Sequence, residues 1–347
     1  MTSIGLFQAL LKRFTAVSYM KPVGQQYRLV DDKKIDKDAI LFKKVYQLED
    51  PLEWMSPLAV EKGFTENYIE TPDREPYANK ILDCQAKLSE GKSFLLSEGT
   101  GHAGVGSVFD LSNASVAKLM GNKVVLVSLG GIGRSIDELM LNKAVFDQAG
   151  VELIGVVINK VREDKYDKIK KVVTQGLARQ GVDVLGVIPY VKMLTKPTVA
   201  EIHESLKTTL LEGEAGLGNK VNRILIGAML THDALDYFEE NTLLIVPANR
   251  EGLVMTALFA NKVKTMNFSI AGIIFTGGIK PHEKIIELIQ DSSIPFLFSE
   301  EDSYVVATKI NSLLVKVRAS ETDKITKIQD LIETYVDVDK ICERCGE

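Results

Sequence analysis

The sequence predicts an α/β protein organised around a parallel sheet, and two observations lead to this prediction. From Phe94 to Pro189, short apolar runs alternate strictly with helical stretches, and a similar alternation starts again at Arg223. Several runs end in polar or glycine-rich segments, and open α/β sheets bind their ligands at such strand ends. Strict alternation also implies right-handed crossovers between parallel strands.

The composition is that of a globular protein with enough residues for two domains. The 347 residues have a formal net charge of −5 and no basic block, so we do not expect nucleic acid as a partner. No apolar run reaches the roughly 20 residues of a membrane-spanning helix, and residues 1–14 lack a signal-peptide pattern. Three scattered cysteines argue against a disulfide framework. We therefore expect a cytoplasmic protein without membrane contact.

The chain opens with a helix rather than a strand. Residues 2–13 have the apolar spacing of a helix, and residues 16–20 form a short strand that stops before Pro22. Residues 50–76 are rich in proline and irregular, and residues 77–91 form a helix that buries Cys84. The strand that should precede the first helix of such an alternation is missing.

The central stretch contains four expected strands, at residues 94–97, 124–128, 153–158 and 184–189. The apolar run that opens it is typical of a strand buried on both faces of a parallel sheet. It leads into a loop with Gly99, Gly101, Gly104 and Gly106, whose backbone can turn sharply and approach a ligand. Glu98 begins this loop. A carboxylate in this position can hold magnesium directly or through water, so Glu98 is the strongest single candidate.

Four motifs at strand ends together resemble one family. They are Tyr19-Met-Lys-Pro-Val-Gly24, Ser97-Glu-Gly-Thr-Gly101, Val157-Ile-Asn-Lys160 and Gly186-Val-Ile-Pro189. In order and spacing they are similar to the dethiobiotin synthetase-like P-loop ATPases. The version that forms the N-terminal region of long phosphate acetyltransferases, also found as stand-alone cobyrinic acid a,c-diamide synthase-like proteins, is the most similar. The resemblance implies an AAA-type P-loop NTPase-like domain over residues 1–212, with ATP and Mg²⁺ as cofactors.

The resemblance also implies that the first strand and the phosphate loop are missing from this sequence. In the family that loop ends in Gly-Lys-Thr or Gly-Lys-Ser, which places Met1 on the lysine and Thr2 on the magnesium-binding hydroxyl residue. Because the loop's N–H groups and lysine hold the phosphates, ATP and Mg²⁺ are expected only with a complete loop. Two interpretations stay open: an incomplete N-terminus, which we favour, or a relative that has lost the loop. Without the first strand, its two neighbours lose their ladders or close together.

Several positions receive a role from the resemblance. Lys21 matches the family's second lysine, which reaches toward substrate or phosphate, and it is the catalytic candidate together with Glu98. Asp38 matches a metal-linked aspartate, with the helix-capping role of many aspartates as the alternative, so the metal candidates are Thr2, Asp38 and Glu98. The expected cofactor-binding residues are Thr2, Lys21, Gly99, Gly101, Asn159 and Pro189. Of these, Asn159 would read the adenine edge through its amide, and Pro189 would lie on the base side.

A second domain is expected after a helix at 194–211 and a glycine-rich linker at 213–220. Residues 221–320 resemble the DRTGG domain that follows the ATPase-like domain in the same acetyltransferases, which implies a smaller α/β domain. Where that family has Pro-Gly-Asp-Arg, this chain has Pro247-Ala-Asn-Arg250. The candidate regulatory residues are Arg250, Thr276, Gly277 and Gly278. The last three would either hold an anion on their amides or form a plain strand-to-helix turn.

Residues 321–347 are expected to form a helix through Tyr335 and then a polar tail. Cys342 and Cys345 have the spacing of half a zinc site, but no second pair or histidine lies nearby. The chain stops where the long acetyltransferases continue into their catalytic domain, so acetyl transfer is not expected.

Three functional hypotheses follow. The leading one is a nucleotide-binding regulatory protein, oligomeric, with a small-molecule metabolite or nucleotide as ligand and an acetate-metabolism enzyme as a possible partner. The alternatives are an ATP-dependent ligase or amidotransferase that activates a carboxylate, and a scaffold without a phosphate loop.

Overall fold

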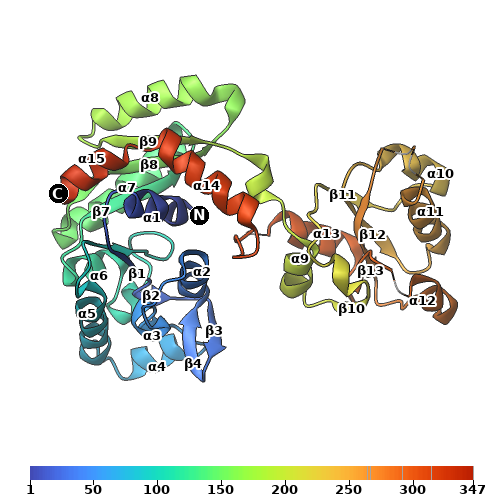
Figure 1. Cartoon of the computed structure of the whole chain (residues 1–347), viewed down its shortest axis with the longest axis horizontal. Coiled ribbons are helices and arrows are strands. Elements are labelled where there is room, and N and C mark those ends of the chain that lie inside the picture. The colour runs from blue at the N-terminus through green and yellow to red at the C-terminus, as the bar shows by residue number, and fades with distance from the viewer. Residues whose placement is uncertain (264, 266, 291, 314, 347) are drawn as a thin grey trace. The chain divides into compact units, whose positions relative to one another are not determined.

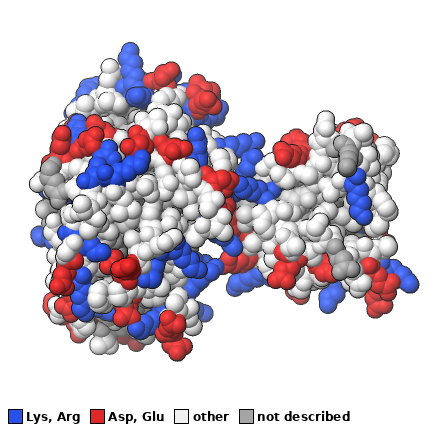
Figure 2. Space-filling view, viewed as in Figure 1, with Lys and Arg blue, Asp and Glu red and all other residues white. Residues whose placement is uncertain are grey.

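The computed structural model describes residues 1–263, 265, 267–290, 292–313 and 315–346, and it divides into two compact units (Figure 1). One unit contains Met1–Val191 together with Val317–Glu347, and the other contains Lys192–Lys316. Each unit is α/β with mainly parallel strands, which confirms the expected fold class. On the visible face of each unit, acidic and basic side chains are interspersed (Figure 2). Within the described ranges, no helix is both long and apolar enough to cross a bilayer.

The strands expected to share one parallel sheet in the first unit belong to separate sheets. β1 (Val17–Met20) pairs with β6 (Phe94–Ser97). β7 (Val124–Leu129), β8 (Leu153–Val161) and β9 (Val184–Pro189) form a second sheet in that order. In the described part of the chain, β6 and β7 share no ladder. The sequence left two outcomes open for the strands on either side of the missing one: they lose a ladder, or they close together. The structure shows the first, because β6 and β7 do not pair with each other in the described residues.

The break in the sheet changes how deeply the strands are buried. All four residues of β1 are buried, and so are Ile154–Ile158 of β8. All four residues of β6, by contrast, are only half-buried, and β7 has no fully buried residue. The expectation that residues 94–97 are buried on both faces was wrong, because burial of this run needs a strand on its second edge.

Helices from both ends of the chain pack together in the first unit. α1 (Thr2–Leu11) lies beside α14 (Thr322–Tyr335), as the blue and red helices of Figure 1 show. A Cβ atom on Gly5 would lie 2.3 Å from Ile332 Cγ1, so glycine permits this close approach. Other helices of the unit are α2 (Lys37–Tyr46), α3 (Leu52–Met55), α4 (Phe64–Glu70), α5 (Glu75–Ser89), α6 (Asn113–Leu119), α7 (Gly133–Ala149) and α8 (Tyr166–Ala178).

The expected polar tail after Tyr335 is wrong. Residues Val338–Cys345 form α15, which buries Ile341 and Cys342, and Val336 makes an antiparallel bridge to Gly186 of β9. Arg344 donates hydrogen bonds to the Ile154 carbonyl and to Asp183. The segment reads as polar because only one face of a short helix is apolar.

The charged segment before α2 forms a hairpin. β3 (Tyr27–Val30) and β4 (Lys33–Asp36) pair antiparallel through a two-residue turn at Asp31 and Asp32, with φ of 48° and 59°. Aspartate tolerates this left-handed conformation better than most residues, so the acidic pair suits the turn. Before the hairpin, β2 (Val23–Gly24) pairs parallel with β5 (Leu58–Ala59).

The second unit has one continuous sheet, in the order β10-β14-β13-β12-β11. β11 (Arg223–Ile226), β12 (Thr242–Pro247), β13 (Ile270–Thr276) and β14 (Phe296–Phe298) are parallel, and β10 (Thr209–Glu212) is antiparallel. Its helices are α9 (Val199–Leu206), α10 (Thr231–Ala234), α11 (Glu251–Asn261), α12 (Glu283–Ile289) and α13 (Ser303–Asn311).

The single helix expected at 194–211 was wrong. It is divided into a 3-10 turn at Lys192–Thr195, then α9 and β10, because Lys207 leaves the helix at φ 53° and the next residues pair with β14. The glycine-rich segment that follows lies inside the second unit, where a Cβ atom on Gly213 would lie 2.1 Å from the Ile294 carbonyl oxygen.

Candidate functional site

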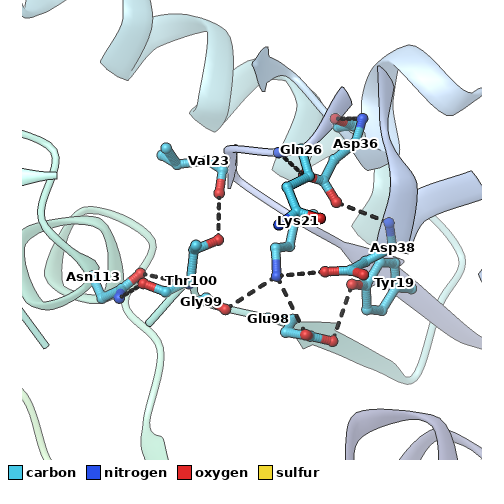
Figure 3. Close-up of polar contacts among 11 residues, drawn as sticks. Tyr19, Lys21, Val23, Gln26, Asp36, Asp38, Glu98, Gly99, Thr100 and Asn113 are labelled. Carbon is cyan, nitrogen blue, oxygen red and sulfur yellow. Dashed lines mark hydrogen bonds and ion pairs between the residues drawn. The ribbon is translucent and has the colours of Figure 1, made fainter. Parts of the chain in front are cut away.

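A buried lysine marks the carboxyl ends of β1 and β6. Lys21 directly follows β1, and its amide donates to the Met55 carbonyl at 2.7 Å. Its side chain is only 5% exposed, and Nζ lies 2.9 Å from Asp38 Oδ2 and 3.3 Å from Glu98 Oε1. Nζ also donates to the Gly99 carbonyl at 3.2 Å (Figure 3). Lys21, Asp38, Glu98 and Gly99, all predicted site residues, are therefore in direct contact.

The two carboxylates are held by different local structures. The Glu98 amide donates to the Met20 carbonyl at 2.8 Å, which fixes Glu98 beside Lys21, and the Tyr19 hydroxyl donates to Glu98 Oε2 at 3.2 Å. Asp38 lies in the first turn of α2 but does not cap it. Asp36 is the cap, accepting from the Asp38 amide at 2.8 Å. This division leaves the Asp38 carboxylate available to Lys21.

Burial and charge act against each other in this cluster. Burial lowers the pKa of Lys21, but the carboxylates of Glu98 and Asp38 raise it more, so its pKa lies above 10.5 and the side chain stays protonated. Burial and the nearby Glu98 carboxylate raise the pKa of Tyr19 well above 10.0, so it remains a hydrogen-bond donor. Burial also raises the pKa of Asp36, although the Asp38 amide opposes this effect. The cluster thus holds one permanent cation among acidic groups.

The glycine-rich loop after Glu98 is fixed by Asn113. The Thr100 amide donates to Asn113 Oδ1 at 3.2 Å, and Asn113 Nδ2 donates to the carbonyls of Thr100 and His102 at 2.8 and 2.7 Å. A Cβ atom on Gly99 would lie 2.8 Å from Asn113 Oδ1, and Gly101 has a φ of 69°. These glycines are therefore required by the shape of the loop, whatever the loop binds.

A large cavity separates β6 from β7. It has a volume of about 770 Å³, and its lining includes the consecutive residues Phe94–Glu98 and Val124–Val127. Met1, Thr2, Gly99 and Gly101 also line it. We call this space the interstrand cavity. It brings the start of α1 together with the loop that follows Glu98.

The two base-side candidates lie elsewhere on the same edge of the sheets. Asn159, in β8, donates through Nδ2 to Thr2 Oγ1 at 3.3 Å, while its Oδ1 accepts from the Lys160 amide at 2.8 Å. Pro189 ends β9 and pairs with Val161. Neither residue belongs to the lining of the interstrand cavity. Asn159 thus joins the start of α1 to β8 in this structure.

The carboxylates do not fit a magnesium ion in this arrangement. Asp38 and Glu98 offer the oxygen ligands that Mg²⁺ prefers, but Lys21 Nζ lies within 3.3 Å of an oxygen of each and already compensates their charge. In the part of the chain that the structure describes, no three His, Cys, Asp or Glu side chains gather closely enough to hold a metal. A divalent cation would therefore compete with the Lys21 ammonium for these oxygens.

The candidates in the second unit make internal contacts. Arg250 Nη2 donates to the Met229 carbonyl at 2.6 Å, which fixes the turn after β11. Thr276 is buried and shares a hydrogen bond of 2.7 Å with Ser303. The amides of Gly277 and Gly278 donate to the carbonyls of Glu301 and Ser299 at 2.8 and 3.4 Å. The sequence left open whether these residues hold an anion on their amides or form a plain strand-to-helix turn. In this geometry the two glycine amides already have backbone partners, as in a plain turn.

Sequence reasoning missed three residues that organise the site: Tyr19, Asp36 and Asn113. A signal for Asp36 was available, because it stands two residues before Asp38 at the start of an expected helix. Tyr19 binds Glu98, 79 positions away, and Asn113 binds Thr100, 13 positions away. Only the folded chain reveals these contacts.

Parallel strands with crossover helices, and a lysine with carboxylates at the strand ends, are the features of an α/β protein whose polar site lies at the carboxyl ends of its strands. Residues 1–198 match the AAA domain family and residues 201–313 match the DRTGG domain. The chain belongs to the AAA domain family and carries a DRTGG domain, as its sequence motifs predicted.

Characterised relatives agree with this combination. The chain is 25% identical to a phosphate acetyltransferase of Nitratidesulfovibrio vulgaris over 98% of its own length and 49% of that protein. It is also 25% identical to a phosphate acetyltransferase of Synechocystis, over 97% of the chain and 48% of the relative. An ATP-dependent dethiobiotin synthetase BioD of Clostridium kluyveri is 24% identical over 47% of the chain and 69% of that protein. The chain therefore spans about half the length of the acetyltransferases that it matches.

Proposed function

We propose that this chain is a cytoplasmic regulatory protein that binds a nucleotide or a phosphorylated metabolite at the carboxyl ends of β1 and β6. The carrying observation is that Glu98 and Gly99, which both contact the Lys21 ammonium, line the interstrand cavity together with Met1 and Thr2 at the start of α1. A buried ammonium and the N-terminus of a helix both favour an anion. The similarity to one half of phosphate acetyltransferases supports a regulatory role rather than a catalytic one.

In this proposal the residues around Lys21 have separate roles in binding the anion. Lys21 would provide the positive charge for a phosphate group, in exchange for one of its two carboxylate contacts. Tyr19 and Asp36 would hold the acidic side chains in place during that exchange. Because Asp38 and Glu98 repel phosphate, the affinity is set by how much of their charge Lys21 compensates.

Nucleotide titration of the 347-residue chain tests the proposal. The only tryptophan, Trp54, lies in α3 of the first unit, so its fluorescence and isothermal calorimetry report binding with ATP and ADP as probes. We expect saturable binding without phosphate release. Glu98→Gln should tighten binding several-fold by removing a negative charge beside Lys21. Glu301→Gln, which removes an exposed partner of Lys309 in the second unit, is the matched control and should leave affinity unchanged.

Two results would replace this proposal. Phosphate release that depends on a carboxylate substrate, and that Glu98→Gln abolishes, would support the ligase hypothesis, which the similarity to dethiobiotin synthetase favours. No binding of either nucleotide at millimolar concentration, with the chain folded, would support the scaffold. In the regulatory proposal the chain is a homo-oligomer that acts on an enzyme of acetate metabolism. Light scattering and copurification from its own organism test those two points.

A further inference from the structure

The outward face of α11 in the second unit is apolar, where the solvent side of a helix is normally polar. The inward face of this helix buries Leu253, Val254, Ala257 and Ala260. On the opposite side, Phe259 is 64% exposed, and Val263, just after the helix, is 44% exposed. Helices on the surface of a globular protein usually turn charged and polar residues toward water. Within the described residues, the outward face of α11 therefore has no apolar cover.

The apolar surface continues onto the neighbouring helix. α10 lies beside α11 (Figure 1), and Leu230, directly before α10, is 61% exposed. A Cβ atom on Gly252 would meet only Thr231 Oγ1, at 3.8 Å, among the described residues. Gly252 is exposed and thus leaves open space on this surface. We use the name α11 patch for Leu230, Gly252, Met255, Phe259 and Val263.

Another helix of the same unit has the usual pattern. α12 exposes Leu288 to 63%, but the other exposed residues of this helix are Glu283, Lys284 and Glu287. A single exposed leucine among charged residues is normal for a protein surface. α11 differs because it carries charge only at its two ends. A continuous apolar surface of this kind marks an interaction site.

The charges at the two ends indicate the partner. Glu251 opens α11, Lys262 follows its last residue, and both are exposed. Neither side chain forms an ion pair with any residue that the structure describes. They lie about three turns apart and so project from the same side of the helix. A second α11 lying antiparallel on the first would bring its Lys262 beside Glu251 and its Glu251 beside Lys262. The surface is complementary to an inverted copy of itself, as a two-fold interface requires.

The shape of the patch favours the same arrangement. In an antiparallel pair of α11 helices, Phe259 of one copy lies opposite the first turn of the other, where Gly252 leaves open space. A glycine lets two helices approach closely, and a large side chain of one helix packs into the space between residues of the other. A parallel pair would instead place like charges together at both ends, which is unfavourable.

We propose that the α11 patch is the contact surface of a homodimer in which two α11 helices pack antiparallel about a two-fold axis. Phe259 of each copy packs against Gly252 and Met255 of the other, and two ion pairs between Glu251 and Lys262 close the ends. The 11 residues of α11 span only about 16 Å. Two such faces bury less than the roughly 800 Å² per partner of a standard interface, so the dissociation constant is micromolar. The proposal rests on the proposed function only for the homo-oligomer and does not depend on nucleotide binding.

Sedimentation velocity of the 347-residue chain at increasing micromolar concentrations tests the surface. Phe259→Ser should weaken association at least about tenfold, because aromatic residues at the centre of an interface carry much of its affinity. Leu288→Ser is the matched control, since it removes an apolar side chain of nearly equal exposure from α12, and it should leave association unchanged. Far-UV circular dichroism checks that both variants are folded. A monomer at every concentration would overturn the surface. An oligomer that persists equally in Phe259→Ser would also overturn it, but would leave the proposed homo-oligomer standing.

Charge reversal tests the antiparallel pairing. Glu251→Lys and Lys262→Glu each bring two pairs of like charges together, so each variant alone should associate about tenfold more weakly at low ionic strength. A mixture of the two variants restores both attractive pairs and should form a heterodimer about as strongly as the unchanged chain dimerises. A mixture that associates no better than either variant alone would overturn the pairing. Nucleotide titration followed by Trp54 fluorescence decides the proposed function separately from these results.

Discussion

The sheets of the two units differ in continuity although both come from alternating apolar runs and helices. In the second unit β12 and β13 have partners on both edges, and every residue of β13 is buried. In the part of the first unit that the structure describes, β6 and β7 each pair on one edge only, and the residues of β6 are half-buried. The run Phe94-Leu-Leu is as apolar as Leu243-Leu-Ile. The comparison teaches that the neighbours of a strand, and not its own sequence, decide its burial.

The units also differ in how they place charge. Lys21 of the first unit is buried between two carboxylates, whereas Lys309 of the second unit pairs with Glu301 on the surface with half of its side chain exposed. A buried charge needs its partners because water cannot replace them. The first unit therefore depends on charge compensation at the carboxyl ends of β1 and β6.

Truncation of one side chain in each sheet should show the largest difference. Ile274→Ala in β13, where the side chain is fully buried, should lower the free energy of unfolding by about 3–4 kcal/mol. Leu96→Ala in β6 should lower it by only about 1 kcal/mol, because this strand already borders an open cavity. Urea unfolding followed by far-UV circular dichroism and by Trp54 fluorescence measures both losses. Equal losses would mean that the gap is closed in solution.

Removal of the two lysine charges should give the next largest contrast. Lys21→Met leaves Asp38 and Glu98 without their shared cation and should cost the first unit about 3 kcal/mol. Lys309→Met breaks an exposed ion pair and should cost less than about 1 kcal/mol. Trp54 fluorescence during urea unfolding measures the first loss. Addition of Glu98→Gln to Lys21→Met should restore part of it, and no restoration would argue against an electrostatic cause.

High pH should destabilise the first unit through Tyr46. Its hydroxyl donates to the Ile4 carbonyl at 2.5 Å, and burial raises its pKa to about 12 from 10.0. Because the folded-state pKa is the higher one, this contribution is present below pH 10 and is lost as the pH rises from 10 to about 12. Tyr46→Phe should cost about 1 kcal/mol at neutral pH. Thermal unfolding against pH should decline less steeply for the variant between these values, and identical slopes would refute this role.

Low pH should have the smallest effect on stability. It should weaken the packing of α15 against the first unit, because Asp183 binds Arg344 and Lys340 of this helix. Hydrogen bonds from Arg344 and Lys340 lower the pKa of Asp183 below 3.8. This stabilisation is present above pH 3.8 and is lost as the pH falls through the lower folded-state pKa. Asp183→Asn should cost less than about 1 kcal/mol, since 44% of the side chain is exposed. Faster hydrogen exchange in α15 of the variant at neutral pH, with α8 unchanged, is the expected signature.

The hairpin and the C-terminal helix show where sequence reasoning lost accuracy. The hairpin of residues 27–36 has only a weak sequence signal, because β3 and β4 are four residues each and both contain exposed residues. Residues 338–345 read as a polar tail, because the apolar stripe of α15 is narrow and the helix contacts α1, β8 and β9, which are far away in sequence. Both segments are defined by partners rather than by their own composition.

The sequence by itself determined the elements with strong local patterns and the residues at their ends. The apolar runs specified the strands, and the motifs around Lys21, Glu98 and Asn159 identified the class of protein, since strand-end positions in parallel sheets follow from chain order. Only the tertiary structure decided which groups meet. It placed the Lys21 ammonium between Asp38 and Glu98, assigned the helix cap to Asp36 and opened the space between β6 and β7. The physical reason is that pairing, burial and charge compensation depend on neighbours from distant parts of the chain.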